Sequence, residues 1–258
     1  MAGGGVATAY DAAMELQGAH VLVTGASRGI GAATVQLFAA AGAKVVINYR
    51  DKAARAEKIA EAIRAAGGTA LTVQADLTDY DSVSAARDLI KAEFGSLDFL
   101  VMNASGGMEA GKGEDYALRL NRDAQVNLLE TMTSIMGEGG RVVFITSHQA
   151  HFVRTFESLP EYMPVALSKR AGEDALRERV PALAEKGIGF VVVSGDMIVG
   201  TATALLLDRS NPGAIESRIA EVGKLYSVEE FAEEIFKAAN EPVPADNTVL
   251  VGDTSKMV

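Results

Sequence analysis

Seven short runs of apolar residues recur along the chain, and segments with helical spacing separate them. Each run is continuous rather than alternating, which is typical of strands covered by helices on both faces of a parallel sheet. The segments between them, such as residues 30–41 and 228–236, repeat apolar residues about every 3.6 positions, as amphipathic helices do. This alternation predicts an α/β fold: a doubly wound, seven-stranded parallel sheet with right-handed crossovers. The predicted strands are HVLVTG (20–25), KVVINY (44–49), TALTVQ (69–74), LDFLVMN (97–103), RVVFITS (141–147), GFVVVSG (189–195) and NTVLVGD (247–253).

No linker or repeat interrupts this alternation, so we expect a single domain over residues 18–258. The preceding residues, 1–17, lack the layout of a secretory signal and are predicted to form a flexible leader. The chain has no cysteine, which excludes disulfides and thiol chemistry and favours a cytoplasmic location. With a net charge of −10 and no apolar window of roughly 18 residues, neither nucleic acid nor a membrane is expected as a partner.

A glycine-rich turn joins the first predicted strand to the first predicted helix. It reads TGASRGIG (24–31), with glycines at 25, 29 and 31. One glycine allows a tight turn, one lets the backbone approach a pyrophosphate, and one lets the helix pack closely on the sheet. The free N–H groups at the start of the helix favour phosphate. The strand, turn and helix together therefore predict a dinucleotide site.

The pattern TGxxxGIG resembles the cofactor signature of the short-chain dehydrogenase/reductase family, and the resemblance spans residues 18–253. The pair D-L (76–77) and the turn N-A-S-G (103–106) resemble further family motifs after the third and fourth strands. The resemblance implies a single Rossmann-like domain that binds a nicotinamide dinucleotide. The cofactor-binding residues it implies are Gly25, Ser27, Arg28, Gly29, Ile30, Gly31, Tyr49, Arg50, Asp76, Leu77, Asn103, Ala104, Ser105, Lys169, Gly195, Ile198 and Thr201.

The second predicted strand bears on the choice of dinucleotide. NAD enzymes usually place an acid after this strand to hold the ribose 2′-hydroxyl, but here the strand ends N-Y-R (48–50), with no acid before Asp51. Arg28 and Arg50 can instead clamp a 2′-phosphate, although both also fit an ordinary solvated surface. We favour NADP(H) over NAD(H).

The family's catalytic set is an asparagine, a serine, a tyrosine and a lysine, which hold the carbonyl oxygen and give it a proton. The resemblance assigns three of these roles to Asn121, Ser147 and Lys169. Aligned on the Ser-Lys pair of V-A-L-S-K (165–169), the family tyrosine falls on Val165, which can donate no proton. The usual acid is therefore expected to be replaced.

Three replacements for the acid stay open. Tyr162 lies three residues before Val165, and because Pro164 favours the first turn of a helix, Tyr162 is expected at or just outside the helix start. It acts either as a substitute acid or as an aromatic wall of the pocket. His148 and His151 follow Ser147 and can donate protons near neutral pH, or they are ordinary loop residues. A third source is substrate or water. The His-x-x-His pair alone is a poor metal signal, and no metal site is predicted.

The sixth predicted strand ends S-G-D-M-I-V-G-T (194–201), where the family commonly has Pro-Gly and a threonine that contacts nicotinamide. Ser194 replaces the proline, and Thr201 comes later than usual. Asp196 is either a capping residue or a polar contact for substrate. Residues 201–223 are predicted to form a helical lid, which with Met108, Phe152, Met163 and Met197 makes an apolar pocket.

The sequence therefore predicts an NADPH-dependent reductase of small-molecule ketones with a non-standard proton donor. Three alternatives remain: a nucleotide-binding protein that has lost hydride transfer and acts as a sensor or partner, an isomerase or dehydratase, and a double-bond reductase. The resemblance implies a homodimer or homotetramer.

Overall fold

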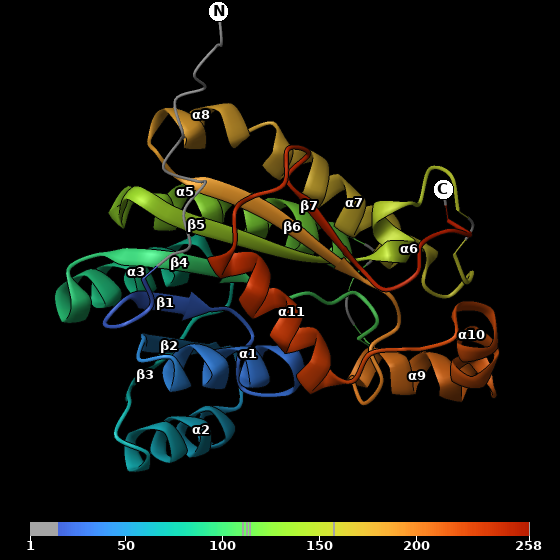
Figure 1. Ribbon diagram of the computed structural model, residues 1–258, viewed down its shortest axis with the longest axis horizontal. Helices are drawn as coiled ribbons and strands as arrows, with labels where there is room; N and C mark the ends of the chain where they lie inside the picture. Colours follow the sequence, from blue (N-terminus) through green and yellow to red (C-terminus); the bar gives the residue numbers. More distant parts are fainter. Residues whose placement is uncertain (1–14, 110, 112, 114, 157, 258) are drawn as a thin grey trace, which may run out of the picture.

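The computed structural model describes residues 15–109, 111, 113, 115–156 and 158–257. In this part of the chain seven strands form one all-parallel sheet in the order β3-β2-β1-β4-β5-β6-β7 (Figure 1). The predicted doubly wound Rossmann-like α/β fold is confirmed. The strands are β1 (His20–Val23), β2 (Lys44–Tyr49), β3 (Thr69–Gln74), β4 (Leu97–Met102), β5 (Met136–Ser147), β6 (Gly189–Gly195) and β7 (Thr248–Val251).

Helices cover both faces of the sheet (Figure 1). One core lies between the sheet and α1, α2 and α11, and a second lies between the sheet and α3, α5, α7 and α8. The helices are α1 (Gly29–Ala40), α2 (Ala53–Ala65), α3 (Tyr80–Phe94), α4 (Tyr116–Leu118), the π-helical turn η1 (Arg119–Asp123), α5 (Ala124–Met132), the 3₁₀ turn η2 (Thr133–Ile135), α6 (His148–His151), α7 (Met163–Arg177), α8 (Val180–Glu185), α9 (Ala202–Ser210), α10 (Ala214–Val222) and α11 (Val228–Asn240).

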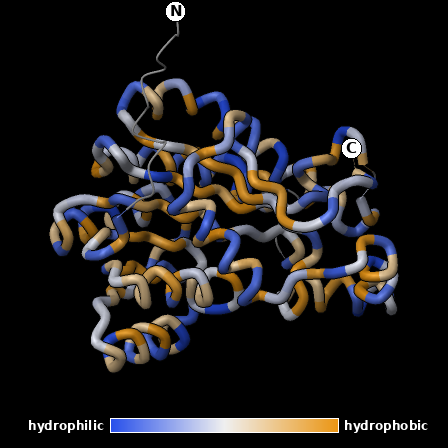
Figure 2. Tube along the Cα trace, viewed as in Figure 1, coloured by the Kyte–Doolittle hydropathy of each residue, from blue (hydrophilic) through white to orange (hydrophobic). Residues whose placement is uncertain are grey.

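The continuous apolar runs are explained by burial on both sheet faces. Along β1, Val21 and Val23 pack in the first core, whereas Leu22 between them packs in the second, and all three are buried. Successive side chains of a strand point to opposite faces, so a doubly covered strand needs apolar residues at every position. Figure 2 shows these hydrophobic strands in the interior of the fold.

Strand β5 begins earlier than its apolar run predicts. The run starts at Arg141, but the strand starts at Met136, and its register against β4 shifts between Leu97 and Phe99. The additional segment M-G-E-G-G has no apolar continuity, so periodicity alone misses it. The predicted carboxyl end, Ser147, is correct.

The helix ends follow local capping chemistry where the sequence provides it. Before α11, the Ser227 hydroxyl accepts a hydrogen bond from the Glu230 N–H, and the Glu230 carboxylate accepts one from the Ser227 N–H. This reciprocal pair satisfies two N–H groups that the helix leaves unbonded. The apolar face of α11 then packs against the sheet through Phe231 and Ile235.

The predicted helical segment over residues 201–223 is present as two helices, α9 and α10, beyond the carboxyl end of β6 (Figure 1). A third apolar cluster lies beneath it, and its buried members are Ala150, Tyr162, Val165, Ala166, Met197, Ala204, Leu207 and Leu225. The predicted leader falls mostly on residues 1–14, outside the described residues. No helix in the described ranges is both long and apolar enough to cross a bilayer.

Candidate active site

A cleft of about 870 Å³ lies along the carboxyl ends of the strands. Parallel sheets of this type bind ligands at this edge. Most of the residues predicted from the sequence line the cleft; the exceptions among the described residues are Gly31, Asn121 and Gly195. Those lining it are Gly25, Ser27, Arg28, Gly29, Ile30, Tyr49, Arg50, Asp76, Leu77, Asn103, Ala104, Ser105, Ser147, Tyr162, Lys169, Ile198 and Thr201.

The three glycines of the turn after β1 have different surroundings. Gly25 and Gly29 have φ angles of 64° and 55°, which disfavour other residues. A Cβ on Gly29 would meet nothing within 4 Å, so the backbone there is open to the cleft. A Cβ on Gly31 would lie 2.6 Å from Nδ2 of Asn103 and 2.8 Å from the Gly25 carbonyl oxygen. Gly31 thus serves close packing beneath the turn, outside the cleft.

Buried polar side chains hold this turn in place. Asn48, at the end of β2, accepts a hydrogen bond from the Gly25 N–H at 3.2 Å and donates to the carbonyls of Val73 and Ala75. From the sequence, Asn48 was notable only because it stands where NAD enzymes usually have an acid. Its amide bridges β3 to the glycine-rich turn after β1, a role that a buried asparagine at a strand end can fill because its side chain both donates and accepts hydrogen bonds.

Positive charge gathers at the β2 end of the cleft. Arg28 and Arg50 line the cleft as predicted, and Lys52 and Arg55, which sequence reasoning missed, lie beside them. Arg50 donates to Asp51 at 2.7 Å and to the Tyr116 hydroxyl at 2.5 Å. The hydrogen bond with Asp51 raises the pKa of Arg50, which keeps this guanidinium charged.

At the other end of the cleft, Tyr162 meets Ser147. The Tyr162 hydroxyl lies 3.2 Å from the Ser147 hydroxyl, although 15 residues separate them in sequence. Tyr162 directly precedes α7, with Pro164 in the first turn as predicted, and its ring is buried. Val165 and Lys169, one turn apart on α7, line the same cleft. In the described part of the chain no acidic group pairs with Lys169. This end therefore combines two hydroxyls and a cation.

Asn121 lies in a helical segment, as predicted, but it does not line the cleft. It lies in the π-helical turn η1, a feature that is frequent at functional sites. Its side chain donates to the Gly106 carbonyl at 2.8 Å and to the Ser168 hydroxyl at 2.9 Å, and accepts from the Gly106 N–H. Asn121 thus ties the loop after β4 to α7 and does not line the cleft.

The two histidines after Ser147 do not line the cleft either. Nε2 of His148 donates to the Val251 carbonyl at 3.1 Å, and Nδ1 accepts from the Ser194 hydroxyl at 2.8 Å. Burial lowers the pKa of His148 despite the nearby charge of Asp196, so this ring stays neutral. His151 directs Nδ1 to the carboxylate of Glu173 at 2.9 Å. Both rings are engaged in structural contacts.

The end of β6 connects the cleft to the lid. A Cβ on Gly195 would lie 2.5 Å from the Phe231 ring, so this glycine allows β6 to pack on α11. Asp196, which is partly buried, lines the cleft and pairs at 2.8 Å with the buried Arg218 of α10. Thr201 caps α9 by accepting from the Ala204 N–H. From the sequence, Asp196 was either a capping residue or a polar contact for substrate. The ion pair with Arg218 was not predicted.

The apolar part of the cleft agrees partly with the prediction. Met108 and Met197 line it, together with Val165 and the lid helix α9. Phe152 and Met163 do not line it. The Phe152 ring instead packs edge-on against His151, with ring centroids 4.8 Å apart.

Comparisons of this sequence with known proteins find one matching family and several relatives. A sequence model of the family described as short chain dehydrogenase matches residues 19–211. The chain is 33% identical over 169 residues to a versicolorin reductase of Emericella nidulans, covering 63% of this chain and 62% of the relative. It is 32% identical over 183 residues to the 1-cyclohexenylcarbonyl-CoA reductase of Streptomyces collinus, covering 69% and 64%. These matches span less than two thirds of each relative's length.

Solved structures resemble the whole fold. A short chain dehydrogenase from Burkholderia cenocepacia in complex with NADP superposes with a TM-score of 0.77 at 27% identity, covering 93% of this chain and 98% of that one. A hydroxysteroid dehydrogenase from Escherichia coli gives a TM-score of 0.76 at 25% identity, covering 92% and 96%.

Proposed function

Because the chain belongs to the short-chain dehydrogenase family, we propose that it is an NADPH-dependent carbonyl reductase in which Tyr162 supplies the proton. In this proposal Val165 occupies the position of the family's tyrosine, and Tyr162 replaces it from just outside α7. The observation that carries the proposal is the contact of 3.2 Å between the hydroxyls of Tyr162 and Ser147 in the cleft that Lys169 also lines.

The cleft fits a nicotinamide dinucleotide. At the start of α1 no side chain caps the helix, and the open backbone at Gly29 leaves room for a pyrophosphate beside the free N–H groups. Ser27, Arg28 and Ile30 line the cleft at the same point. NADP(H) is favoured over NAD(H) because Arg28, Arg50, Lys52 and Arg55 lie where a 2′-phosphate needs positive charge.

The proposed chemistry divides the work between cofactor and protein. When bound, the dinucleotide supplies the hydride that the carbonyl carbon accepts, and the C=O electron pair moves to oxygen. The Ser147 hydroxyl donates a hydrogen bond to that oxygen, and the Tyr162 hydroxyl gives it a proton. The phenolate left behind is stabilised by the ammonium of Lys169. The product is an alcohol, and solvent returns the proton to Tyr162.

The substrate end of the cleft suggests the class of carbonyl compound. Met108, Met197 and the lid helix α9 supply an apolar wall around the two hydroxyls. Asp196 and Glu109 also line this part of the cleft, and Arg218 balances the charge of Asp196. We propose a small apolar or aromatic ketone as the substrate class, because apolar walls with few polar groups bind such molecules.

Replacing Tyr162 tests the proposal most directly. Tyr162→Phe removes only the hydroxyl, so we expect kcat for ketone reduction to fall by about 10²-fold or more while NADPH affinity is kept. NADPH oxidation is followed by absorbance over a panel of ketones, and NADPH binding by fluorescence. Tyr80→Phe is the matched control, because Tyr80 is half exposed at the start of α3, outside the cleft. Unchanged turnover in Tyr162→Phe would eliminate this acid.

The same assay separates the alternatives. The panel includes a conjugated enoyl thioester, because one relative is a reductase of 1-cyclohexenylcarbonyl-CoA. Reduction of the thioester without reduction of ketones would favour the double-bond reductase. Tight NADPH binding with no turnover, and an effect of Lys169→Ala on affinity alone, would favour a sensor.

A further inference from the structure

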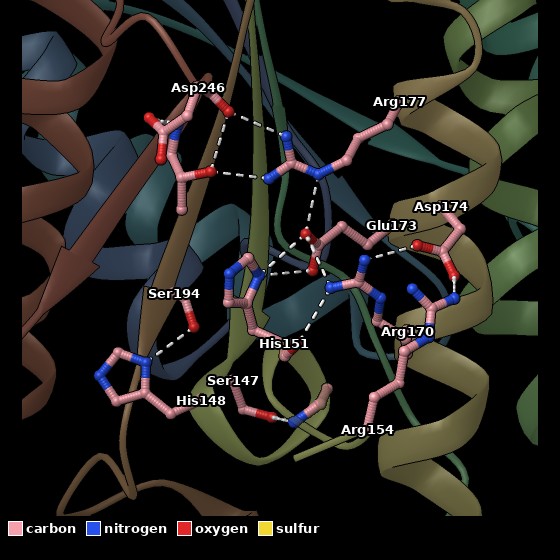
Figure 3. Close-up of polar contacts among 12 residues, drawn as sticks. Ser147, His148, His151, Arg154, Arg170, Glu173, Asp174, Arg177, Ser194 and Asp246 are labelled. Atoms are coloured by element: carbon pink, nitrogen blue, oxygen red, sulfur yellow. Dashed lines mark hydrogen bonds and ion pairs between the residues drawn. The ribbon is translucent and has the colours of Figure 1, made fainter. Parts of the chain in front are cut away.

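A charged cluster of His151, Arg170, Glu173 and Arg177 joins α6 to α7, and none of its members lines the cleft (Figure 3). At its centre is Glu173 of α7, whose side chain is completely buried. Its carboxylate accepts hydrogen bonds from Nδ1 of His151 at 2.9 Å and from Nε of Arg177 at 2.9 Å, and Arg170 lies 3.5 Å away. A buried carboxylate needs such partners to stay ionised. Although burial raises the pKa of Glu173, its bond to His151 and the nearby cations hold it below the ordinary value.

The cluster joins α6 to α7 at two points. His151 is the last residue of α6, and its ring reaches Glu173 on the second half of α7. Arg170, one residue after Lys169, donates to the carbonyl of His151 at 2.9 Å. The side chain and the backbone of His151 are thus both bound by α7, as Figure 3 shows.

Helix α6 depends on such contacts because it is a single turn of four residues. One helical turn has little stability of its own. Ser147 caps this turn by accepting from the Ala150 N–H at 3.3 Å, so the orientation of α6 sets the direction of the Ser147 hydroxyl. Tyr162 lies at the start of α7. The separation of the two hydroxyls is therefore fixed by how α6 lies against α7.

We propose that His151 and Glu173 are positioning residues that hold the Ser147 hydroxyl against Tyr162. This inference rests on the proposed function. In that proposal the donor Tyr162 directly precedes α7 instead of lying within it, so other contacts must hold Ser147 in place against it. Nδ1 of His151 carries the proton in this contact, because an ionised carboxylate only accepts. An amide at the same δ position can therefore replace the ring.

The test compares three variants of His151 and its surroundings. His151→Ala is expected to lower kcat at least about 10-fold with NADPH affinity within about 2-fold, because small misplacements of reacting groups are costly. His151→Asn keeps an N–H donor at the δ position and is expected to restore most of kcat. Arg177→Ala is the matched control: it removes an ion pair from the same carboxylate on the side facing Thr248. It is expected to lower Tm and keep kcat.

A double variant separates positioning from general damage. In the Tyr162→Phe background, adding His151→Ala is expected to cause little further loss, because the two changes disable one unit. Independent losses that multiply, or equal loss of kcat in Arg177→Ala, would overturn the inference.

If the wild-type protein reduces no ketone, the proposed function fails, and the positioning role is then read from crystal structures. In His151→Ala the contact of 3.2 Å between Ser147 and Tyr162 is expected to be lost. Its persistence there would refute the role of His151 whatever the reaction is.

Discussion

Gly172→Ala tests how tightly α7 packs against the π-helical turn η1. A Cβ on Gly172 would lie only 1.9 Å from the carbonyl oxygen of Asn121 and 3.0 Å from its carbonyl carbon. Both atoms belong to the backbone, so no side chain can rotate away. Restoring an ordinary contact of 3.4 Å requires the two helices to separate by about 1.5 Å. Lys169, less than one turn earlier on α7, would move with the helix.

Two effects of opposite sign compete in this variant. Alanine improves helix propensity by up to about 1 kcal/mol over glycine. Overpacking a close contact costs about 1–3 kcal/mol and is at its largest where backbone must move. We therefore expect a net loss of about 1–2 kcal/mol, which lowers Tm by roughly 2–8 °C in a chain of this size. A helix shift of this size also predicts a fall in kcat of about 10²-fold, because a misplacement of about 1 Å already costs that much.

Thermal unfolding and NADPH oxidation measure the two effects separately. Ala171→Gly, at the neighbouring position, changes helix propensity without touching Asn121, and it is expected to lower Tm while keeping kcat. If Gly172→Ala instead raised Tm and left kcat unchanged, propensity alone would govern the site. The close packing of α7 on η1 would then be refuted.

Three further predictions follow from charged and titratable groups. Burial lowers the pKa of His148 from its ordinary value of 6.5, so below pH 6.5 the unfolded chain takes up a proton more readily than the folded chain does. The unfolding free energy measured in urea is therefore expected to fall as the pH falls below 6.5, and to fall less steeply in His148→Phe. Arg218→Ala leaves the partly buried Asp196 without its cation, which costs about 1.5–3 kcal/mol. Tm is expected to fall, and proteolysis is expected to cut α9 and α10 sooner. Replacing Arg28 and Arg50 together by alanine is expected to weaken NADPH binding about 10- to 100-fold in fluorescence titrations and NADH binding clearly less, because only NADPH carries a 2′-phosphate. Equal weakening of both cofactors would contradict the proposed preference.

Local sequence predicted the parts of the site that lie on one strand-turn-helix unit. Gly25 and Gly29 of the turn after β1 line the cleft, as predicted, and β2, β3 and β6 have the predicted bounds. These features depend on neighbouring residues, whose spacing is fixed by the chain. Lys52 and Arg55 were missed because they lie at the start of α2, beyond the strand end where the cofactor acid was sought.

The features of the site that the sequence did not predict depend on contacts between residues that are far apart in the chain. The charged spacing of Arg170, Glu173 and Arg177 is typical of an exposed helix with ion pairs at i,i+3 and i,i+4. Glu173 is nevertheless buried, because His151 arrives from α6 across a connection that no periodicity describes. The meeting of Tyr162 with Ser147 depends on the path of that same connection.

Two residues that the resemblance marks as departures from the family pattern, Ser194 and Tyr162, make contacts at the start of α6. Ser194, in place of the usual proline, gives its hydroxyl to the buried ring of His148. Tyr162, proposed to act in place of Val165, contacts Ser147, the residue just before His148. Returning Ser194 alone to proline would leave Nδ1 of His148 buried without a partner, at a cost of about 1–3 kcal/mol. This loss would destabilise α6, the single helical turn that begins at His148 and that Ser147 caps. In the proposed mechanism the two belong to one arrangement, because the contacts that anchor α6 also fix the Ser147 hydroxyl that Tyr162 contacts.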